Sequence, residues 1–179
     1  MKALLVIDVQ NGLVNLSDFD AELAKIETMI MDFKREKYPV IFTRHVDDIE
    51  ESPLYKGSEG SHLHHSLQAY ADDVIEKQTP ASFYQTELVD VLEKWGVDHL
   101  FITGFNTEFC CQFTAISAFD RGYSVTFIED ATGTVNTKET YEMEGLDIRD
   151  FVGTVLHWSN VIEVLDYEEY VDVYKNQLL

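Results

Sequence analysis

Short apolar runs separated by amphipathic stretches constrain the fold of this chain more than any other feature. Residues 3–7, 39–43 and 99–103 are almost continuously apolar, and 123–128 is apolar apart from Ser124 and Thr126. Strands read this way when helices bury both faces of a parallel sheet. Between the first two runs, from Phe19 to Lys37, apolar residues recur at helical spacing. We therefore predict an α/β fold: a doubly wound three-layer sandwich with about six mostly parallel strands and helices on both faces.

The remaining pattern supplies the other elements of this fold. Short strands are expected around 74–75 and near 161–164, and helices at 86–95, at 107–121, within 137–155 and at 166–173. Residues 45–72 lack a clean period and hold four of the six histidines. A loop of that length is usually functional or mobile.

Length and charge limit the classes of function. A chain of 179 residues is expected to form one domain over 1–179. The net charge of −20 argues against a nucleic-acid or anionic-membrane partner, because binding phosphate needs clustered Lys and Arg. A small neutral or cationic ligand fits better.

The distribution of apolar residues and cysteines indicates the compartment. No apolar run approaches the ~20 residues that span a bilayer, and Asp8 interrupts the first run, which therefore resembles a strand more than a signal peptide. Two adjacent cysteines, Cys110 and Cys111, do not make a disulfide framework. We expect a cytoplasmic protein with reduced thiols and no membrane contact.

Three reactive side chains follow predicted strands. Asp8 ends the first, Lys77 follows the third, and Cys110 lies in the first helical turn after the fourth. In open α/β sheets the ligand crevice lies beyond the carboxyl ends of the strands, so these side chains are expected to converge. Taken singly, each also suits an ordinary turn, surface or core position. Together they favour covalent acyl transfer.

Each group has a role in such chemistry. Cys110 is the nucleophile, and the positive end of its helix favours a thiolate. Asp8 takes the thiol proton, and Lys77 stabilises the charge that develops. The backbone N–H groups of Asn106 and Cys110 form the oxyanion hole. We further expect Gly104 to end the preceding strand and Thr107 to cap the helix.

Three ordered motifs carry a family resemblance. Leu5 to Gln10, Lys77 with the residues 81–88 behind it, and Gly104 to Thr114 followed by 118–123 resemble the isochorismatase-like cysteine hydrolases. That superfamily includes nicotinamidases and N-carbamoylsarcosine amidohydrolases. The resemblance runs from residue 3 to about residue 165.

The resemblance implies an Asp, Lys, Cys triad at Asp8, Lys77 and Cys110. Its spacing between Thr107 and Thr114 selects Cys110 as the nucleophile, and Cys111 then takes the place of a small hydrophobe. It also implies a cis peptide at Phe105–Asn106 that directs the Asn106 N–H into the oxyanion hole, and a homo-oligomer, either a dimer or a tetramer.

The chain departs from the nicotinamidase pattern after its second strand. Nicotinamidases typically carry an Asp-x-His there, with further histidines that bind a metal, whereas this chain reads Thr43-Arg44-His45-Val46-Asp47. A solvated His-rich loop is the simpler account of His62, His64 and His65. We expect neither metal nor cofactor. His45 and Phe83 are expected to line the substrate pocket, although a core position suits Phe83 equally well.

These features predict a cysteine hydrolase that cleaves a small amide or carbamoyl C–N bond through a thioester on Cys110. One alternative is vinyl ether cleavage of the isochorismatase type, which does not need the cysteine. Another is a catalytically silent member that serves as a binding subunit. The sequence does not identify the substrate.

Overall fold

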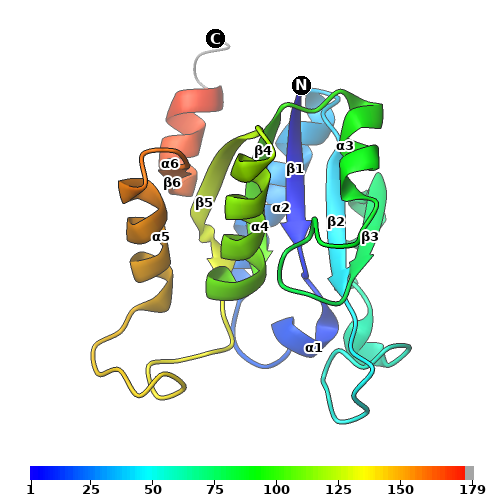
Figure 1. The fold of residues 1–179 in the computed structure, drawn as a ribbon, viewed down its shortest axis with the longest axis vertical. Helices are drawn as coiled ribbons and strands as arrows, with labels where there is room; N and C mark the ends of the chain where they lie inside the picture. Colours follow the sequence, from blue (N-terminus) through cyan, green and yellow to red (C-terminus); the bar gives the residue numbers. More distant parts are fainter. Residues whose placement is uncertain (176–179) are drawn as a thin grey trace.

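A single parallel sheet forms the centre of the molecule (Figure 1). The computed structural model describes residues 1–175. The sheet has the strand order β3-β2-β1-β4-β5-β6, and every neighbouring pair is parallel. The predicted α/β class is confirmed, with an all-parallel sheet in the described residues. Its strands are β1 (Lys2–Ile7), β2 (Val40–His45), β3 (Asp73–Lys77), β4 (His99–Phe105), β5 (Ser124–Gly133) and β6 (Glu163–Leu165).

Helices cover both faces of this sheet. The α-helices are α1 (Asn11–Val14), α2 (Asp20–Arg35), α3 (Leu88–Trp95), α4 (Gln112–Asp120), α5 (Ile148–Trp158) and α6 (Tyr167–Tyr170). Two 3₁₀ turns, η1 (Glu59–Ser61) and η2 (Gln68–Tyr70), and two π-helical turns, η3 (Thr107–Cys111) and η4 (Val171–Lys175), complete the elements.

Strand β1 shows why the runs are continuously apolar. Leu5 and Ile7 pack into a core with side chains of α3, α4 and α5. Leu4 and Val6 point to the opposite face and pack with α2 and α6. All four side chains are fully buried, since successive residues of a strand face opposite sides. The central strand therefore needs apolar residues at every position.

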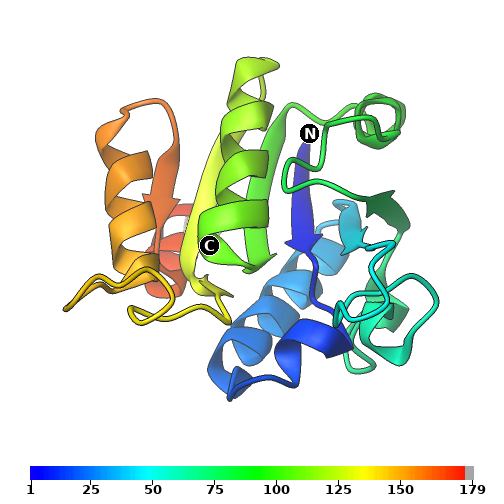
Figure 2. The same cartoon turned by 60° about the horizontal axis from the view of Figure 1, so that its bottom comes forward.

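The sheet has its topological switch between β1 and β4. From β1 the chain continues into α1 and α2 on one face, and from β4 it continues into η3 and α4 on the other. Connections that leave in opposite directions open a crevice at the carboxyl ends of these neighbouring strands. Segment 134–147 and the segment 46–72 with α1 lie on either side of this end of the sheet (Figure 2).

Three boundaries differ from the sequence prediction. Gly104 does not end β4: the strand continues to Phe105, and Gly104, at φ 116°, lets β4 approach β1 where a Cβ would collide with the backbone of Ile7. Strand β5 runs five residues past the expected end at 128, to Gly133. The helix expected within 137–155 covers Ile148–Trp158, because Asp147 caps it by accepting a hydrogen bond from the Asp150 N–H.

Other parts of the chain were only roughly predicted. Helix α1 was not predicted, and the helix expected at 166–173 is divided into α6 and η4. The segment 45–72 contains the two 3₁₀ turns η1 and η2 and is otherwise irregular after the end of β2. In residues 1–175, helices long and apolar enough to cross a bilayer are absent.

Candidate active site

Asp8, Lys77 and Cys110 meet at the carboxyl ends of the strands, as predicted. Lys77, the last residue of β3, places its Nζ 2.6 Å from Asp8 Oδ2 and 3.2 Å from Cys110 Sγ. The side chains of Asp8 and Lys77 have no exposed surface, whereas Cys110 is partly exposed. The three groups thus form one cluster in which only Cys110 is partly exposed, here called the Asp8–Lys77–Cys110 cluster.

Thr43 fixes the carboxylate of Asp8. Its hydroxyl donates to Asp8 Oδ1 at 2.6 Å, and its carbonyl accepts from the Asp8 N–H at 3.2 Å. Asp8 itself has a φ of 49°, in the left-handed region that non-glycine residues seldom adopt. The backbone turn at the end of β1 and the fully buried Thr43 on β2 therefore orient the carboxylate.

The electrostatics of the cluster favour a charged lysine and a protonated thiol. Burial alone would lower the pKa of Lys77, but Asp8 and Cys110 beside it outweigh burial and raise the pKa. For Cys110, burial and the nearby Asp8 carboxylate raise the thiol pKa, while Lys77 opposes them without prevailing. At rest, the thiol holds its proton next to a carboxylate that can accept it.

His45 also belongs to this site. Its Nδ1 lies 3.3 Å from Lys77 Nζ, and its Nε2 lies 3.2 Å from Asp47 Oδ1. Gln10 positions the backbone of His45, because its amide donates to the His45 carbonyl and accepts from the His45 N–H, both at 2.8 Å. The same amide donates to the carbonyl of Ser61 at 2.8 Å.

Thr43 and Gln10 therefore position members of the candidate site, although sequence reasoning assigned them no role. Gln10 is the last residue of the first motif, two positions after Asp8. Both are completely buried. The signal that could have identified them is a hydrogen-bonding side chain inside an apolar run, because burial obliges such a group to find a partner.

The donor atoms here do not fit a metal site of the nicotinamidase type. Within residues 1–175, the potential ligand group is Asp8, His45 and Cys110, whose atoms lie within 4.8 Å of one another. The Lys77 ammonium contacts all three, so a cation already lies among them. The rings of His64 and His65 instead contact each other, with centroids 4.3 Å apart and planes tilted by 47°.

Cys110 lies in a π-helical turn, η3, which precedes α4. Turns of this kind often occur at functional sites. The Phe105–Asn106 peptide bond is cis, as the family resemblance implied. The N–H groups of Phe109 and Cys111 both donate to the Asn106 carbonyl.

The prediction that Thr107 caps this helix is wrong. Asn106 holds the cap position. The Thr107 hydroxyl is buried and instead donates a hydrogen bond to the Thr132 hydroxyl on β5, at 2.9 Å.

Cys111 and Phe83 lie in the core. Cys111 is fully buried in the cluster beneath α3, α4 and α5. Phe83 is 5% exposed, stacks on Tyr123 at 5.8 Å, and carries the Arg121 guanidinium over its ring at 5.0 Å. The structure thus brings His45 to the Asp8–Lys77–Cys110 cluster and packs Phe83 into the core, so that pocket lining by Phe83 stays a prediction.

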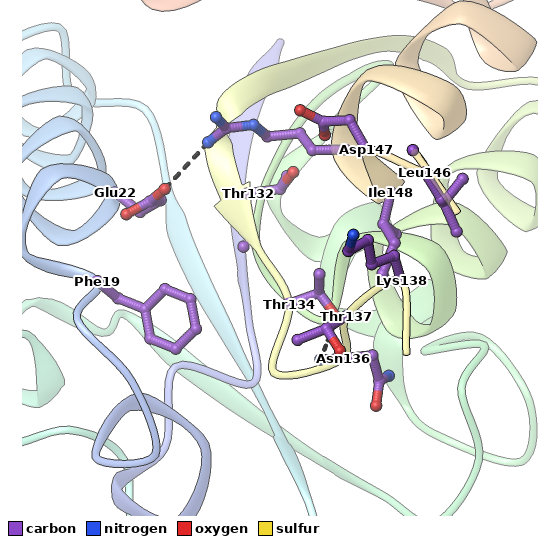
Figure 3. A pocket seen from close by; sticks show the side chains of 13 residues that line it. Phe19, Glu22, Thr132, Thr134, Asn136, Thr137, Lys138, Leu146, Asp147 and Ile148 are labelled. Carbon is purple, nitrogen blue, oxygen red and sulfur yellow. Dashed lines mark hydrogen bonds and ion pairs between the residues drawn. The ribbon is translucent and has the colours of Figure 1, made fainter. Parts of the chain in front are cut away.

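A separate cavity of about 500 Å³ lies where β5, α2 and the start of α5 meet. Figure 3 shows Phe19 and Glu22 on one side of it and the loop residues Thr134 to Lys138 on the other. The Glu22 carboxylate crosses it to Arg149 at 3.0 Å. Its lining contains no member of the Asp8–Lys77–Cys110 cluster.

Comparisons with known proteins agree with this fold. The Isochorismatase domain model matches residues 2–159. Nicotinamidase 3 of Arabidopsis thaliana is 34% identical over 151 residues, which are 75% of this chain and 74% of that protein. The ureidoacrylate amidohydrolase of Pantoea ananatis is 28% identical over 64% of this chain and 46% of that protein. An isochorismatase-like protein from Burkholderia xenovorans LB400 superposes with a TM-score of 0.83 at 29% identity, covering 98% of this chain and 88% of that one.

The sheet order and the match across most of the chain define an isochorismatase-type fold of the α/β class. The chain belongs to the isochorismatase family and is a hydrolase of that family.

Proposed function

We propose that this protein is a cysteine hydrolase that cleaves a small amide or carbamoyl C–N bond through a thioester on Cys110. The observation that carries the proposal is the position of the Lys77 ammonium, 2.6 Å from the Asp8 carboxylate and 3.2 Å from the Cys110 thiol. A nucleophile, a base and a cation in contact are the groups that acyl transfer needs. The two amidohydrolase relatives also support this class of reaction.

The first half of the reaction forms the thioester. Asp8 takes the proton of the Cys110 thiol, and the sulfur attacks the substrate carbonyl carbon. The carbonyl electron pair moves to oxygen, where the backbone N–H groups of Asn106 and Cys110 receive the oxyanion. Such donors contribute on the order of 3 kcal/mol each to the transition state. When the oxyanion collapses, the C–N bond breaks and the amine leaves with the proton held by Asp8.

The second half returns the enzyme to its starting state. Water attacks the thioester carbonyl and gives a proton to Asp8, and the new oxyanion occupies the same hole. Collapse breaks the C–S bond, releases the acid, and leaves a thiolate that regains its proton from Asp8. Lys77 keeps its charge throughout, because its pKa is raised by the two groups it contacts. His45 lies beside Lys77, and we expect it to contact the substrate.

Vinyl ether cleavage remains the second candidate, since the fold is named for it. That reaction does not need a thiol. The packing of Lys77 against Cys110 Sγ favours the amide reaction. A silent binding member is disfavoured by the pair of Lys77 with Asp8, because a buried ion pair is costly to maintain without a use.

Assays of wild type and two cysteine variants with a panel of candidate substrates test this proposal. Wild type, Cys110→Ala and Cys111→Ala are incubated with nicotinamide, ureidoacrylate, other primary amides, carbamoyl compounds and isochorismate. Ammonia release, vinyl ether cleavage and covalent adducts by intact mass are measured. We expect Cys110→Ala to lose amide turnover and the adduct, and Cys111→Ala to retain both. Loss of turnover only in Cys111→Ala, or isochorismate as the only substrate, would contradict the proposal.

We also propose that the protein forms a homo-oligomer through the exposed outer sides of η3, α4 and α5. Large apolar side chains recur there at helical spacing, and Trp158 is 78% exposed. An apolar surface suits self-association in a chain whose net charge is −20, because it brings two copies together without pairing their like charges. We call this surface the α4/α5 apolar face; it consists of Phe109, Phe113, Ile116, Phe119, Phe151, Val155 and Trp158.

Sedimentation velocity tests the oligomer. We expect wild type to sediment as a dimer or larger, and Phe113→Glu with Trp158→Glu to shift it toward monomer. Ile49→Glu is the control, since Ile49 is also exposed but lies in the loop after β2. A monomeric wild type, or equal dissociation in the control, would count against this face.

A further inference from the structure

Three consecutive residues at the start of the Cys110 turn, Asn106, Thr107 and Glu108, each contact the end of β5 or the residues that follow it. Asn106 Oδ1 accepts from the Val135 N–H at 3.1 Å, and the Thr107 hydroxyl donates to Thr132. The third residue, Glu108, contacts the residues that follow β5. The turn proposed to hold the oxyanion is therefore bound, residue by residue, to the end of β5 and the start of segment 134–147.

Glu108 makes the densest of these contacts. Its Oε1 accepts from the Thr134 hydroxyl at 2.9 Å, the Asn136 amide at 2.7 Å and the Tyr141 hydroxyl at 3.0 Å. Its Oε2 is buried from solvent. Hydrogen bonds to a carboxylate are about twice as strong as those between neutral groups. One side chain thus gathers three donors from a segment that has no regular secondary structure.

These contacts suit positioning and not proton transfer. The donors that Glu108 binds belong to the protein, and its second oxygen is closed to water. Glu108 also lies two residues before Cys110, within the same π-helical turn. A shift of that turn would move the Asn106 and Cys110 N–H groups away from the oxyanion, and small misplacements of such groups cost large factors in rate.

We propose that Glu108 is a positioning residue that holds the oxyanion turn in place by binding Thr134, Asn136 and Tyr141. The inference rests on the proposed function, in which that turn receives the oxyanion. It adds a residue outside the Asp8–Lys77–Cys110 cluster on which the rate of acyl transfer depends. It also assigns a role to the segment after β5, which fixes the geometry of the turn from outside the site.

Two reactions of the same thiol separate positioning from a general structural role. Acylation by p-nitrophenyl acetate passes through an oxyanion, whereas alkylation by iodoacetamide is a direct displacement without one. Both are followed by mass, with adducts mapped to Cys110. The variants are Glu108→Ala, Glu108→Gln and Tyr141→Phe, with Glu139→Gln as the control, since the Glu139 side chain is 71% exposed on the same segment.

We expect Glu108→Ala to slow acylation by about 10- to 100-fold and to change alkylation by less than about 3-fold. Glu108→Gln keeps an acceptor oxygen and should recover part of the rate, while Tyr141→Phe loses one donor of three and should slow acylation only a few-fold. These two milder variants decide the matter if Glu108→Ala does not fold. The control should match wild type.

The possible failures are distinguishable. If wild-type Cys110 is not acylated, the proposed function fails and this inference fails with it. If wild type is acylated but all Glu108 and Tyr141 variants react at its rate, only the positioning role is overturned. If acylation and alkylation fall together, Glu108 supports the thiol or the fold in general, and the inference is again overturned.

Discussion

Lys77 Nζ lies 2.6 Å from Asp8 Oδ2, and neither side chain has any surface exposed to solvent. Each charge compensates for the burial of the other, since an isolated charge in a protein interior is strongly unfavourable. The pair joins the central strand β1 to β3, two strands away in the sheet. It therefore bears on stability as well as on the chemistry.

Removal of the lysine charge should cost stability. We expect Lys77→Met to lower the free energy of unfolding by about 3–5 kcal/mol, because it leaves Asp8 buried and uncompensated. Urea unfolding followed by circular dichroism measures the change. Lys25→Met is the control: its pair with Asp130 is partly exposed and should be worth less than about 1 kcal/mol. Equal losses of unfolding free energy in both variants would mean that the buried pair contributes no more to stability than the partly exposed one.

The two charges beside Cys110 should act on its thiol in opposite directions. Asp8 raises the thiol pKa and Lys77 lowers it. Asp8→Asn should therefore speed alkylation of Cys110 by iodoacetamide at pH 7.5 while it abolishes hydrolysis, and Lys77→Met should slow alkylation. Quenched alkylation with mass detection gives both rates. A slower reaction in Asp8→Asn would show that the carboxylate does not oppose the thiolate.

The raised thiol pKa also predicts a pH profile. Burial and Asp8 raise the pKa of Cys110 above that of a free thiol. The thiolate fraction of Cys110 should therefore still be rising at pH values where the thiolate fraction of a free thiol, such as that of glutathione, has levelled off. The alkylation rate should climb about tenfold per pH unit from 7 to 9. By the same sign, the shift stabilises the fold below the unfolded-state pKa, and this contribution is lost as pH rises. A rate that levels off between pH 8 and 9 in quenched alkylation assays would contradict this prediction.

The close approach of β4 to β1 should make Gly104 intolerant of substitution. An added Cβ would collide with the Ile7 backbone, so Gly104→Ala should lower the free energy of unfolding by about 3 kcal/mol or more. Gly122→Ala is the matched control, since Gly122 also has positive φ but nothing lies within 4 Å of an added Cβ. The control should lose about 1 kcal/mol from backbone strain alone. Chemical denaturation of both variants measures these changes. Similar losses of unfolding free energy in the two variants would contradict the steric explanation.

The sequence allowed the sheet and the Asp8–Lys77–Cys110 cluster to be predicted because both depend on short-range signals. Buried parallel strands need apolar residues at each position, and reactive residues after such strands converge at one edge. The cis peptide at Phe105–Asn106 was available only through the family resemblance. Its motifs carried information that residue chemistry alone did not.

Other features depend on partners far away in the chain. Thr107 is a residue type that favours a cap, but its hydroxyl donates a hydrogen bond to Thr132, 25 residues later. Glu108 binds donors 26 to 33 residues away, and Gln10 holds His45 and Ser61. Local propensity describes one residue at a time, whereas the hydrogen-bond partners of these side chains depend on tertiary packing. For the same reason, the helix expected somewhere within 137–155 did not distinguish the irregular residues 137–147 from the helix that follows them.

Lys77 ends β3, and β3 is an edge strand of the sheet. Edge elements open more readily than central ones, so the part of the fold that brings the cation to the thiol is among the first that can detach while the core stays intact. A detached β3 would leave β1, the Asp8 carboxylate and the Cys110 turn in place without their ammonium. The working temperature range of such an enzyme would then be set by the fraying of one five-residue strand, and would end before the protein as a whole melts.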